Sequence, residues 1–144
     1  DRSVSRGLGD VYKRQVRENP DAASTRILFV EDEDSVRAFG VRALKKKGFD
    51  VVACNSAENA LEQLEHDKNF GLLITDMVMP GINGAELAAR VREQIPAVKI
   101  ILASGYSEEI ARRELAGSQD FDFLAKPFSL GDLTKKVFDV LSRN

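Results

Sequence analysis

The sequence contains one cysteine, Cys54, among 144 residues. A single cysteine cannot form an internal disulfide, and it cannot supply the cluster of thiolates that a zinc site needs. Long apolar runs are also missing: none approaches the roughly 18 residues of a membrane-spanning helix, and the N-terminus lacks the apolar core of a signal peptide. These absences favour a domain without membrane contact in a reducing compartment, most simply the cytoplasm.

Neither sign of charge dominates the chain. Lys and Arg number 21 against 23 Asp and Glu, which leaves a formal net charge of -2. The sequence therefore has no overall basic field of the kind that draws a protein to nucleic acid, and we expect no direct nucleic-acid contact. The length, together with a hydrophobic content of 43%, suits one compact domain with a real core.

The first 25 residues differ in character from the rest. Residues 1–25 mix charged and small polar residues without an apolar period, as a tail or linker does. Part of this segment, Gly9 to Gln15, resembles translated sequencing-adaptor sequence, and the chain opens on Asp1 without an initiator Met. We expect the natural start to lie later, and we interpret residues 26–143 as the functional domain.

Short apolar segments alternate with helical patterns along the domain. Five segments are predicted to be strands, at residues 27–30, 51–54, 72–76, 98–103 and 121–125. A pattern of helical spacing follows each, and it is weakest after the fourth, from residue 107 to about 115. Near-continuous apolar strands alternating with helices are typical of a doubly wound α/β fold, in which a five-stranded parallel sheet has helices on both faces.

Polar residues suited to capping stand where the helices should begin. Ser56, Asn83 and Ser129 are the predicted N-caps of three of them. For the first helix, Asp34 or Ser35 is expected to take this role.

Charged and polar residues gather at the ends of the predicted strands. Glu31 and Asp32 follow the first strand, and Asp76 ends the third. Ser104 follows the fourth strand, and Lys126 follows the fifth. Because the carboxyl ends of parallel strands lie along one edge of a sheet, these five side chains should converge there.

Three carboxylates at one edge require a positive partner. At a separation of ~4 Å and an effective dielectric of 20, each pair repels by about 4 kcal/mol. Lys126 alone offsets too little of this repulsion. Mg²⁺ suits the remainder, because it binds one or two carboxylates and completes its octahedron with waters and phosphate oxygens.

This constellation points to phosphoryl transfer. Asp76 is ionised at neutral pH and can act as a nucleophile that forms an aspartyl phosphate. Lys126 would neutralise the phosphoryl oxygens, and Ser104 would donate a hydrogen bond to one of them. The phosphorylated group would draw Ser104 inward, and Phe123 could then turn toward the interior and change the surface.

At this point the residues amount to a family resemblance. From Thr25 to about Arg143 the chain resembles a receiver domain of two-component signalling. The resemblance rests on the acidic pair Glu31-Asp32, the run from Asp76 to Gly84, Ser104, and Lys126-Pro127-Phe128. It implies a flavodoxin-like, CheY-like (βα)5 fold and a phosphoryl donor that is a histidine kinase or a histidine phosphotransfer protein.

The resemblance also implies roles for single residues. Asp32 and Asp76 would bind Mg²⁺ directly, Glu31 would act through a water molecule, and the backbone carbonyl of Val78 would complete the protein's ligands. The peptide bond between Lys126 and Pro127 would be cis. Two positions depart mildly from the family, since Ser104 stands where many members have Thr and Phe123 where many have Tyr.

Three stretches carry a narrower similarity: Phe29 to Arg37, Ser104 to Tyr106, and Lys126 to Leu130. They are similar to the C-terminal receiver of hybrid histidine kinases, especially the cell-cycle phosphorelay kinase of alphaproteobacteria. A stand-alone receiver fits the residues equally well. The only histidine, His66, has no kinase phosphoacceptor motif around it and is expected to be an exposed residue at a helix end. No kinase-type nucleotide-binding loop is visible, so any kinase activity would belong to other segments.

Two other function classes compete with the receiver. A phosphohydrolase of the aspartyl-nucleophile class would place a second Asp two residues after the nucleophile, where this chain has Val78. Turnover should therefore be slow, which suits a signal. A flavin-binding carrier on a similar sheet is disfavoured by the acid cluster, because a flavin phosphate prefers hydroxyls and backbone amides.

Overall fold

The computed structural model describes residues 25–105 and 121–143. Its strands are β1 (Arg26–Val30), β2 (Asp50–Cys54), β3 (Leu72–Asp76), β4 (Lys99–Ser104) and β5 (Asp122–Ala125). Its helices are α2 (Asp34–Lys46), α3 (Ala57–His66), α4 (Gly84–Gln94) and α6 (Leu130–Leu141). The predicted tail before residue 25 and the predicted helix at 107–115 lie outside the described residues.

The five strands form one parallel sheet in the order β2-β1-β3-β4-β5. The chain steps outward from β1 to β2 and then returns to place β3 on the other side of β1. A change of direction of this kind opens a crevice between β1 and β3 at the carboxyl edge of the sheet. The predicted doubly wound, flavodoxin-like fold is confirmed, and each strand bound lies within one residue of its predicted position.

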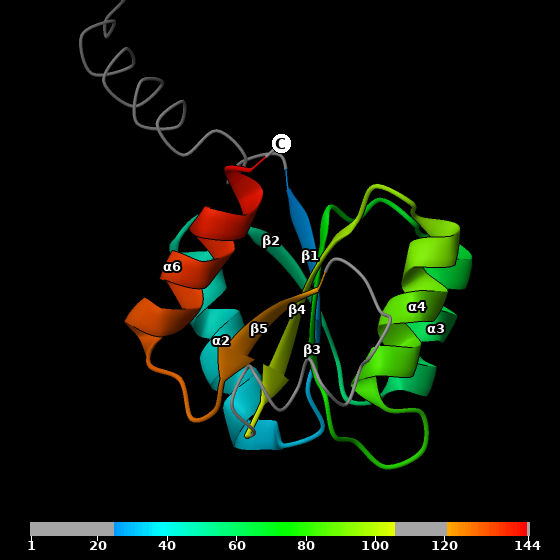
Figure 1. Cartoon of the computed structure of the whole chain (residues 1–144), viewed down its shortest axis with the longest axis horizontal. Helices are drawn as coiled ribbons and strands as arrows, with labels where there is room; N and C mark the ends of the chain where they lie inside the picture. The colour runs from blue at the N-terminus through cyan, green and yellow to red at the C-terminus, as the bar shows by residue number, and fades with distance from the viewer. Residues whose placement is uncertain (1–24, 106–120, 144) are drawn as a thin grey trace, which may run out of the picture.

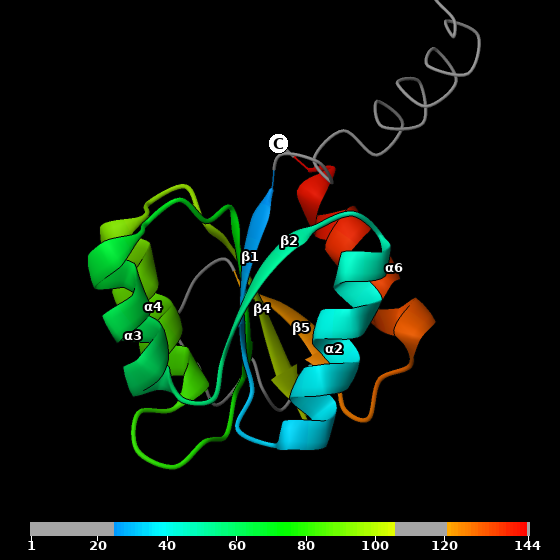
Figure 2. The same cartoon turned by 180° about the vertical axis from the view of Figure 1, so that it is seen from behind.

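Helices cover both faces of the sheet (Figures 1 and 2). The pair α2 and α6 lies on one face, and the pair α3 and α4 lies on the other. Side chains of β1 alternate between two cores: Ile27 and Phe29 pack under α2 and α6, whereas Leu28 and Val30 pack under α3 and α4. Burial on both sides explains why the strand is a continuous apolar run. None of the described helices is long and apolar enough to cross a bilayer.

Three of the predicted helix caps are present. The side chains of Ser56, Asn83 and Ser129 each accept a hydrogen bond from the backbone N–H three residues later, at 3.0, 2.8 and 3.0 Å. Each bond satisfies one of the backbone donors that the first turn of a helix leaves unpaired. These caps fix where α3, α4 and α6 begin relative to the strand ends.

The predicted cap of the first helix is wrong. Helix α2 begins at Asp34, so its N-cap is Glu33, which makes no side-chain cap hydrogen bond. Neither Asp34 nor Ser35 takes that role. The carboxylate of Asp34 instead pairs with the guanidinium of Arg37, one turn along the same helix, at 2.6 Å. The ion pair draws the carboxylate away from the backbone donors that it was expected to cap.

Candidate functional site

Three carboxylates meet at the crevice between β1 and β3. Glu31 and Asp32 follow β1, Asp76 is the last residue of β3, and these strands are neighbours in the sheet. One oxygen from each carboxylate lies within 4.8 Å of the others. Glu31 and Asp76 are only 2% and 8% exposed, whereas Asp32 is exposed. The sheet therefore brings together the three predicted acids, with Asp32 on the open side.

Lys126 lies against the two buried carboxylates. Its Nζ atom is 3.2 Å from Glu31 Oε1 and 3.2 Å from Asp76 Oδ2. The backbone N–H of Lys126 donates to the carbonyl of Ser104 at 2.8 Å, which ties the end of β5 to the end of β4. The Lys126–Pro127 peptide bond is cis, the isomer that the resemblance implies.

The protein environment shifts the pKa of each group in this cluster. Burial is the main cause that raises the pKa of Glu31 and of Asp76 above their usual values. A neighbouring carboxylate adds to each increase, and Lys126 opposes it. Burial lowers the pKa of Lys126, but Asp76 and Glu31 together outweigh this and raise it. One ammonium therefore offsets the three carboxylates only in part.

The loop from β3 to α4 holds Asp76 through tight backbone packing. The N–H of Gly84 donates to the carbonyl of Met77 at 2.9 Å, and a Cβ atom at Gly84 would lie only 2.1 Å from the carbonyl oxygen of Asp76. The N–H of Val78 lies 3.4 Å from Asp76 Oδ1. The side chain of Val78 is exposed, and the metal-binding role of its carbonyl stays a prediction.

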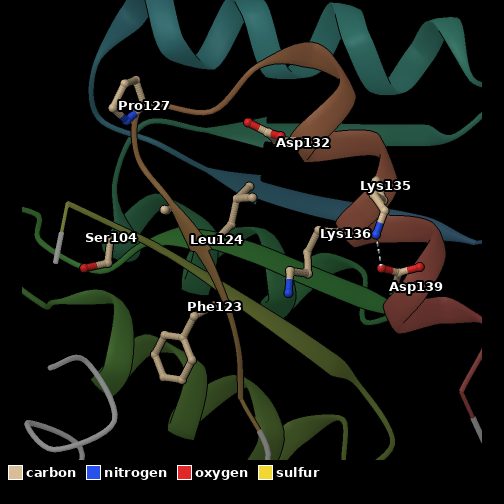
Figure 3. Close-up of a pocket in the computed structure, with 9 residues that line it drawn as sticks. Ser104, Phe123, Leu124, Pro127, Asp132, Lys135, Lys136 and Asp139 are labelled. Carbon is tan, nitrogen blue, oxygen red and sulfur yellow. Dashed lines mark hydrogen bonds and ion pairs between the residues drawn. The ribbon is translucent and has the colours of Figure 1, made fainter. Parts of the chain in front are cut away.

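The two predicted switch residues occupy neighbouring strands. Ser104 is the last residue of β4 and is 2% exposed. Phe123 pairs in register with Leu102, is buried, and packs in the core under α3 and α4. Figure 3 shows its ring on the opposite side of β5 from Leu124. Both residues line a cavity of about 420 Å³ between β5 and α6. An inward turn of Phe123 on phosphorylation stays a prediction.

The chain is similar to known proteins. The family model of the response regulator receiver domain matches residues 27–138. The chain belongs to the response regulator receiver family.

Two curated relatives place this receiver domain in different contexts. The sensor kinase CckA of Brucella abortus (strain 2308) is 39% identical over 123 residues, which are 85% of this chain but only 13% of the kinase. The response regulator receiver protein CpdR of the same strain is 37% identical over 116 residues, which are 81% of this chain and 96% of that protein. Such a domain is thus a small segment of one relative and nearly the whole of the other.

The fold is also similar to solved structures of receiver domains. The crystal structure of the receiver domain from the hybrid histidine kinase CckA has a TM-score of 0.69 and 34% identity, covering 81% of this chain and 99% of that one. A response regulator receiver protein from Pseudomonas putida has a TM-score of 0.70 and 32% identity, covering 80% and 96%.

Two contributors to the receiver site were not predicted as such. Gly84 ends the run that carries the resemblance, but no contact is predicted for it, although its lack of a side chain is what lets the loop pack on Asp76. Arg37 donates to the backbone carbonyl of Glu31 at 2.9 Å. A glycine after a turn is the only sequence signal for the first contact, and we find none for the second. The exposed position of His66 at the end of α3 agrees with its expected minor role.

Proposed function

We propose that Asp76 is the phosphoacceptor of this receiver domain, and that phosphorylation switches partner binding or precedes transfer to a further protein. The observation that carries this proposal is the position of Lys126 Nζ, 3.2 Å from an oxygen of Asp76 and 3.2 Å from one of Glu31. A fixed ammonium beside a buried carboxylate can neutralise the oxygens of an incoming phosphoryl group. Val78 offers no acid for rapid hydrolysis, so the phosphorylated state should persist as a signal does.

The donor set fits Mg²⁺. All the side-chain ligands are carboxylate oxygens, they lie within 4.8 Å of one another, and Asp32 leaves one side open for water and phosphate. Asp32 and Asp76 would bind the ion directly, Glu31 would bind through water, and the carbonyl of Val78 would complete the set. When bound, Mg²⁺ supplies the positive charge that the cluster lacks and neutralises phosphoryl oxygens.

The reaction needs no separate base. A carboxylate oxygen of Asp76 attacks the phosphorus of a phosphohistidine, so that a P–O bond forms as the P–N bond breaks. The imidazole nitrogen leaves with the electron pair and takes a proton from solvent. Lys126 neutralises the transferred group, and the hydroxyl of Ser104 donates a hydrogen bond to it.

The switch would run from Ser104 to Phe123. Movement of the Ser104 hydroxyl toward the phosphoryl group changes the space at the end of β4, next to the strand that carries Phe123. A change in the packing of this ring would alter the surface beside β5.

The phosphoryl donor would be a histidine kinase or a histidine phosphotransfer protein. The kinase and the response regulator among the relatives both belong to such signalling by their printed names. We place the domain in the cytoplasm, either as a segment of a hybrid kinase or as a separate response regulator. Kinase activity would belong to another segment or another protein.

The test is intact-mass analysis after incubation with acetyl phosphate and Mg²⁺. We expect one phosphoryl group on the wild-type protein, none on Asp76→Asn, and none after chelation of the metal. Asp139→Asn, on the exposed surface of α6, is the matched control and should be phosphorylated like wild type. Phosphoramidate serves as a second small donor.

Two outcomes would overturn the proposal. An adduct that persists in Asp76→Asn would place the acceptor elsewhere. No adduct with either donor, on folded protein shown by calorimetry to bind Mg²⁺, would mean that the site does not accept phosphoryl groups.

A further inference from the structure

Arg37 reaches back from helix α2 to the end of β1. Its Nη1 atom donates to the backbone carbonyl of Glu31 at 2.9 Å, and its Nη2 atom pairs with Asp34 Oδ1 at 2.6 Å. The Arg37 side chain is 22% exposed, whereas that of Asp34 is 90% exposed. The guanidinium thus joins a buried carbonyl at the site to an exposed carboxylate on the helix.

The carbonyl of Glu31 needs such a donor because it lies just beyond the sheet. The N–H of Glu31 still donates to the carbonyl of Cys54 on β2, at 3.0 Å, but β1 ends one residue earlier, at Val30. Glu31 is 2% exposed, and a buried carbonyl without a partner is costly. Arg37 supplies the donor that the sheet no longer provides.

The other polar groups of Glu31 are also held. Its Oε2 accepts from the N–H of Glu33 at 3.1 Å, and its Oε1 accepts from Lys126 at 3.2 Å. With the N–H and the carbonyl held as well, both the backbone and the side chain of Glu31 are fixed. Of these contacts, the one to Arg37 acts on the peptide that leads into Asp32.

Asp32 depends on that peptide for its direction. Among the residues that the structure describes, its side chain is exposed and takes part in no hydrogen bond or ion pair. The plane of the Glu31–Asp32 peptide, together with the torsion angles of Asp32 itself, sets where the Asp32 carboxylate points. A rotation of this plane would swing the carboxylate away from Asp76 without disturbing the core.

We propose that Arg37 is a positioning residue that fixes the Glu31–Asp32 peptide so that Asp32 faces Asp76 and the pair can bind a divalent cation. The inference rests on the proposed function, because it assigns a role toward Mg²⁺. Arg37 acts on the affinity for the ion and leaves the transfer of the phosphoryl group unaffected once the ion is bound.

Electrostatics alone predicts the opposite change in Mg²⁺ affinity when Arg37 is removed. Arg37 carries a positive charge close to a cation site, so its removal should tighten Mg²⁺ binding if only charge mattered. If positioning dominates, removal should weaken binding instead. The direction of the change in affinity therefore separates the two explanations.

The experiment measures the Mg²⁺ dissociation constant of the full chain by calorimetry. We expect Arg37→Ala to weaken binding by about tenfold, as the loss of a hydrogen bond to a charged group does. Arg37→Lys, whose ammonium can still reach the carbonyl, should recover most of the affinity. Arg42→Ala on the exposed face of α2 makes the same charge change and should stay within about twofold of wild type.

Phosphorylation by acetyl phosphate gives a second readout. At saturating Mg²⁺ we expect Arg37→Ala to react at the wild-type rate, and at low Mg²⁺ we expect a slower reaction. A rate that stays low at saturating Mg²⁺ would overturn the inference, because Arg37 would then act on the transfer itself.

The remaining outcomes also test the positioning role of Arg37. Mg²⁺ binding by Arg37→Ala that is unchanged or tighter would overturn positioning. If Arg37→Ala fails to fold in a urea titration, Arg37→Gln keeps part of the apolar stem, is too short for the carbonyl, and should still weaken binding. A wild-type protein that neither binds Mg²⁺ nor accepts phosphoryl groups would overturn the proposed function itself. If wild type and the Arg37 variants all bind Mg²⁺ and accept phosphoryl groups equally well, only the positioning role of Arg37 is overturned.

Discussion

The two edges of the sheet use charged side chains in opposite ways. At the carboxyl edge, burial raises the pKa of Glu31 and Asp76, which share the ammonium of Lys126, and a third carboxylate, that of Asp32, lies beside them. At the amino edge, Arg26 contacts Asp50 at 3.1 Å and also pairs with Asp67. That pairing raises the pKa of Arg26, and hydrogen bonds to Asn69 and Arg26 lower that of Asp67.

Further contacts hold the amino edge together. Arg26 lies 4.6 Å from the centre of the Phe70 ring. Lys99, at the start of β4, donates to the carbonyl of Val140 at 3.1 Å, and Arg143 pairs with Asp122 at 2.6 Å. These contacts attach the last turn of α6 to the sheet.

The difference shows that repulsion between like charges is confined to one of these two edges. Opposite charges pair at the amino edge and stabilise the contacts between strands and helices. Like charges gather at the carboxyl edge, where a bound ion can offset them. Repulsion among these carboxylates is the physical reason why the proposed function assigns a cation to this edge.

The variant with the largest expected effect, Gly84→Ala, tests whether backbone packing stabilises the carboxyl edge. Gly84→Ala would place a Cβ atom 2.1 Å from the carbonyl oxygen of Asp76, so the loop must shift. We expect a loss of about 2–3 kcal/mol of unfolding free energy in urea titrations, together with slower phosphorylation. Gly131→Ala in helix α6, where the nearest atom would be 3.8 Å away, is the control: it should not lower stability, because Ala favours a helix more than Gly does, and it should not slow phosphorylation. Wild-type stability in Gly84→Ala would show that the close approach is unimportant.

The second test removes the main cation of the amino edge. Arg26→Ala loses two ion pairs and the contact with Phe70, and we expect about 1–2 kcal/mol lower stability, since Arg26 is only partly exposed. The rate of phosphorylation of the folded protein should not change. Arg90→Ala removes an exposed pair with Glu86 and should cost under about 0.5 kcal/mol. Altered phosphorylation in Arg26→Ala would mean that the two edges are coupled.

The smallest expected effect is the change in stability that Asp76→Asn causes, and its sign is the informative result. Asp76 has a raised pKa in the folded state, so its contribution to stability is present at low pH and is lost as pH rises from about 4 through that raised value. Without Mg²⁺, Asp76→Asn should therefore be more stable than wild type at neutral pH. The advantage should shrink as pH falls.

Urea titrations with a chelator, at several pH values, measure this difference. Added Mg²⁺ should stabilise wild type by about 1.4 kcal/mol at ten times its dissociation constant, and should stabilise Asp76→Asn less. A variant less stable than wild type at neutral pH in chelator would show that Lys126 offsets more charge than its position suggests.

Local patterns in the sequence predicted much of the fold and the site. The strands were found because burial on both faces demands continuous apolar runs, and three helix starts were found because Ser and Asn caps leave a local signal. Once the sheet is parallel, residues at strand ends such as Asp76 and Lys126 must share one edge, whatever the order of the strands. The predicted cap of α2 failed because the ion pair between Asp34 and Arg37 competes with capping, and spacing alone does not rank the two.

The sequence by itself thus determined which residues stand at the carboxyl edge and what chemistry they suit, because strand ends and residue types are local properties. Only the tertiary structure decided which of them touch. It set β1 beside β3, placed Lys126 between Glu31 and Asp76, and brought Gly84 against the backbone of Asp76. Contacts of this kind depend on packing between segments tens of residues apart, and no local period records them.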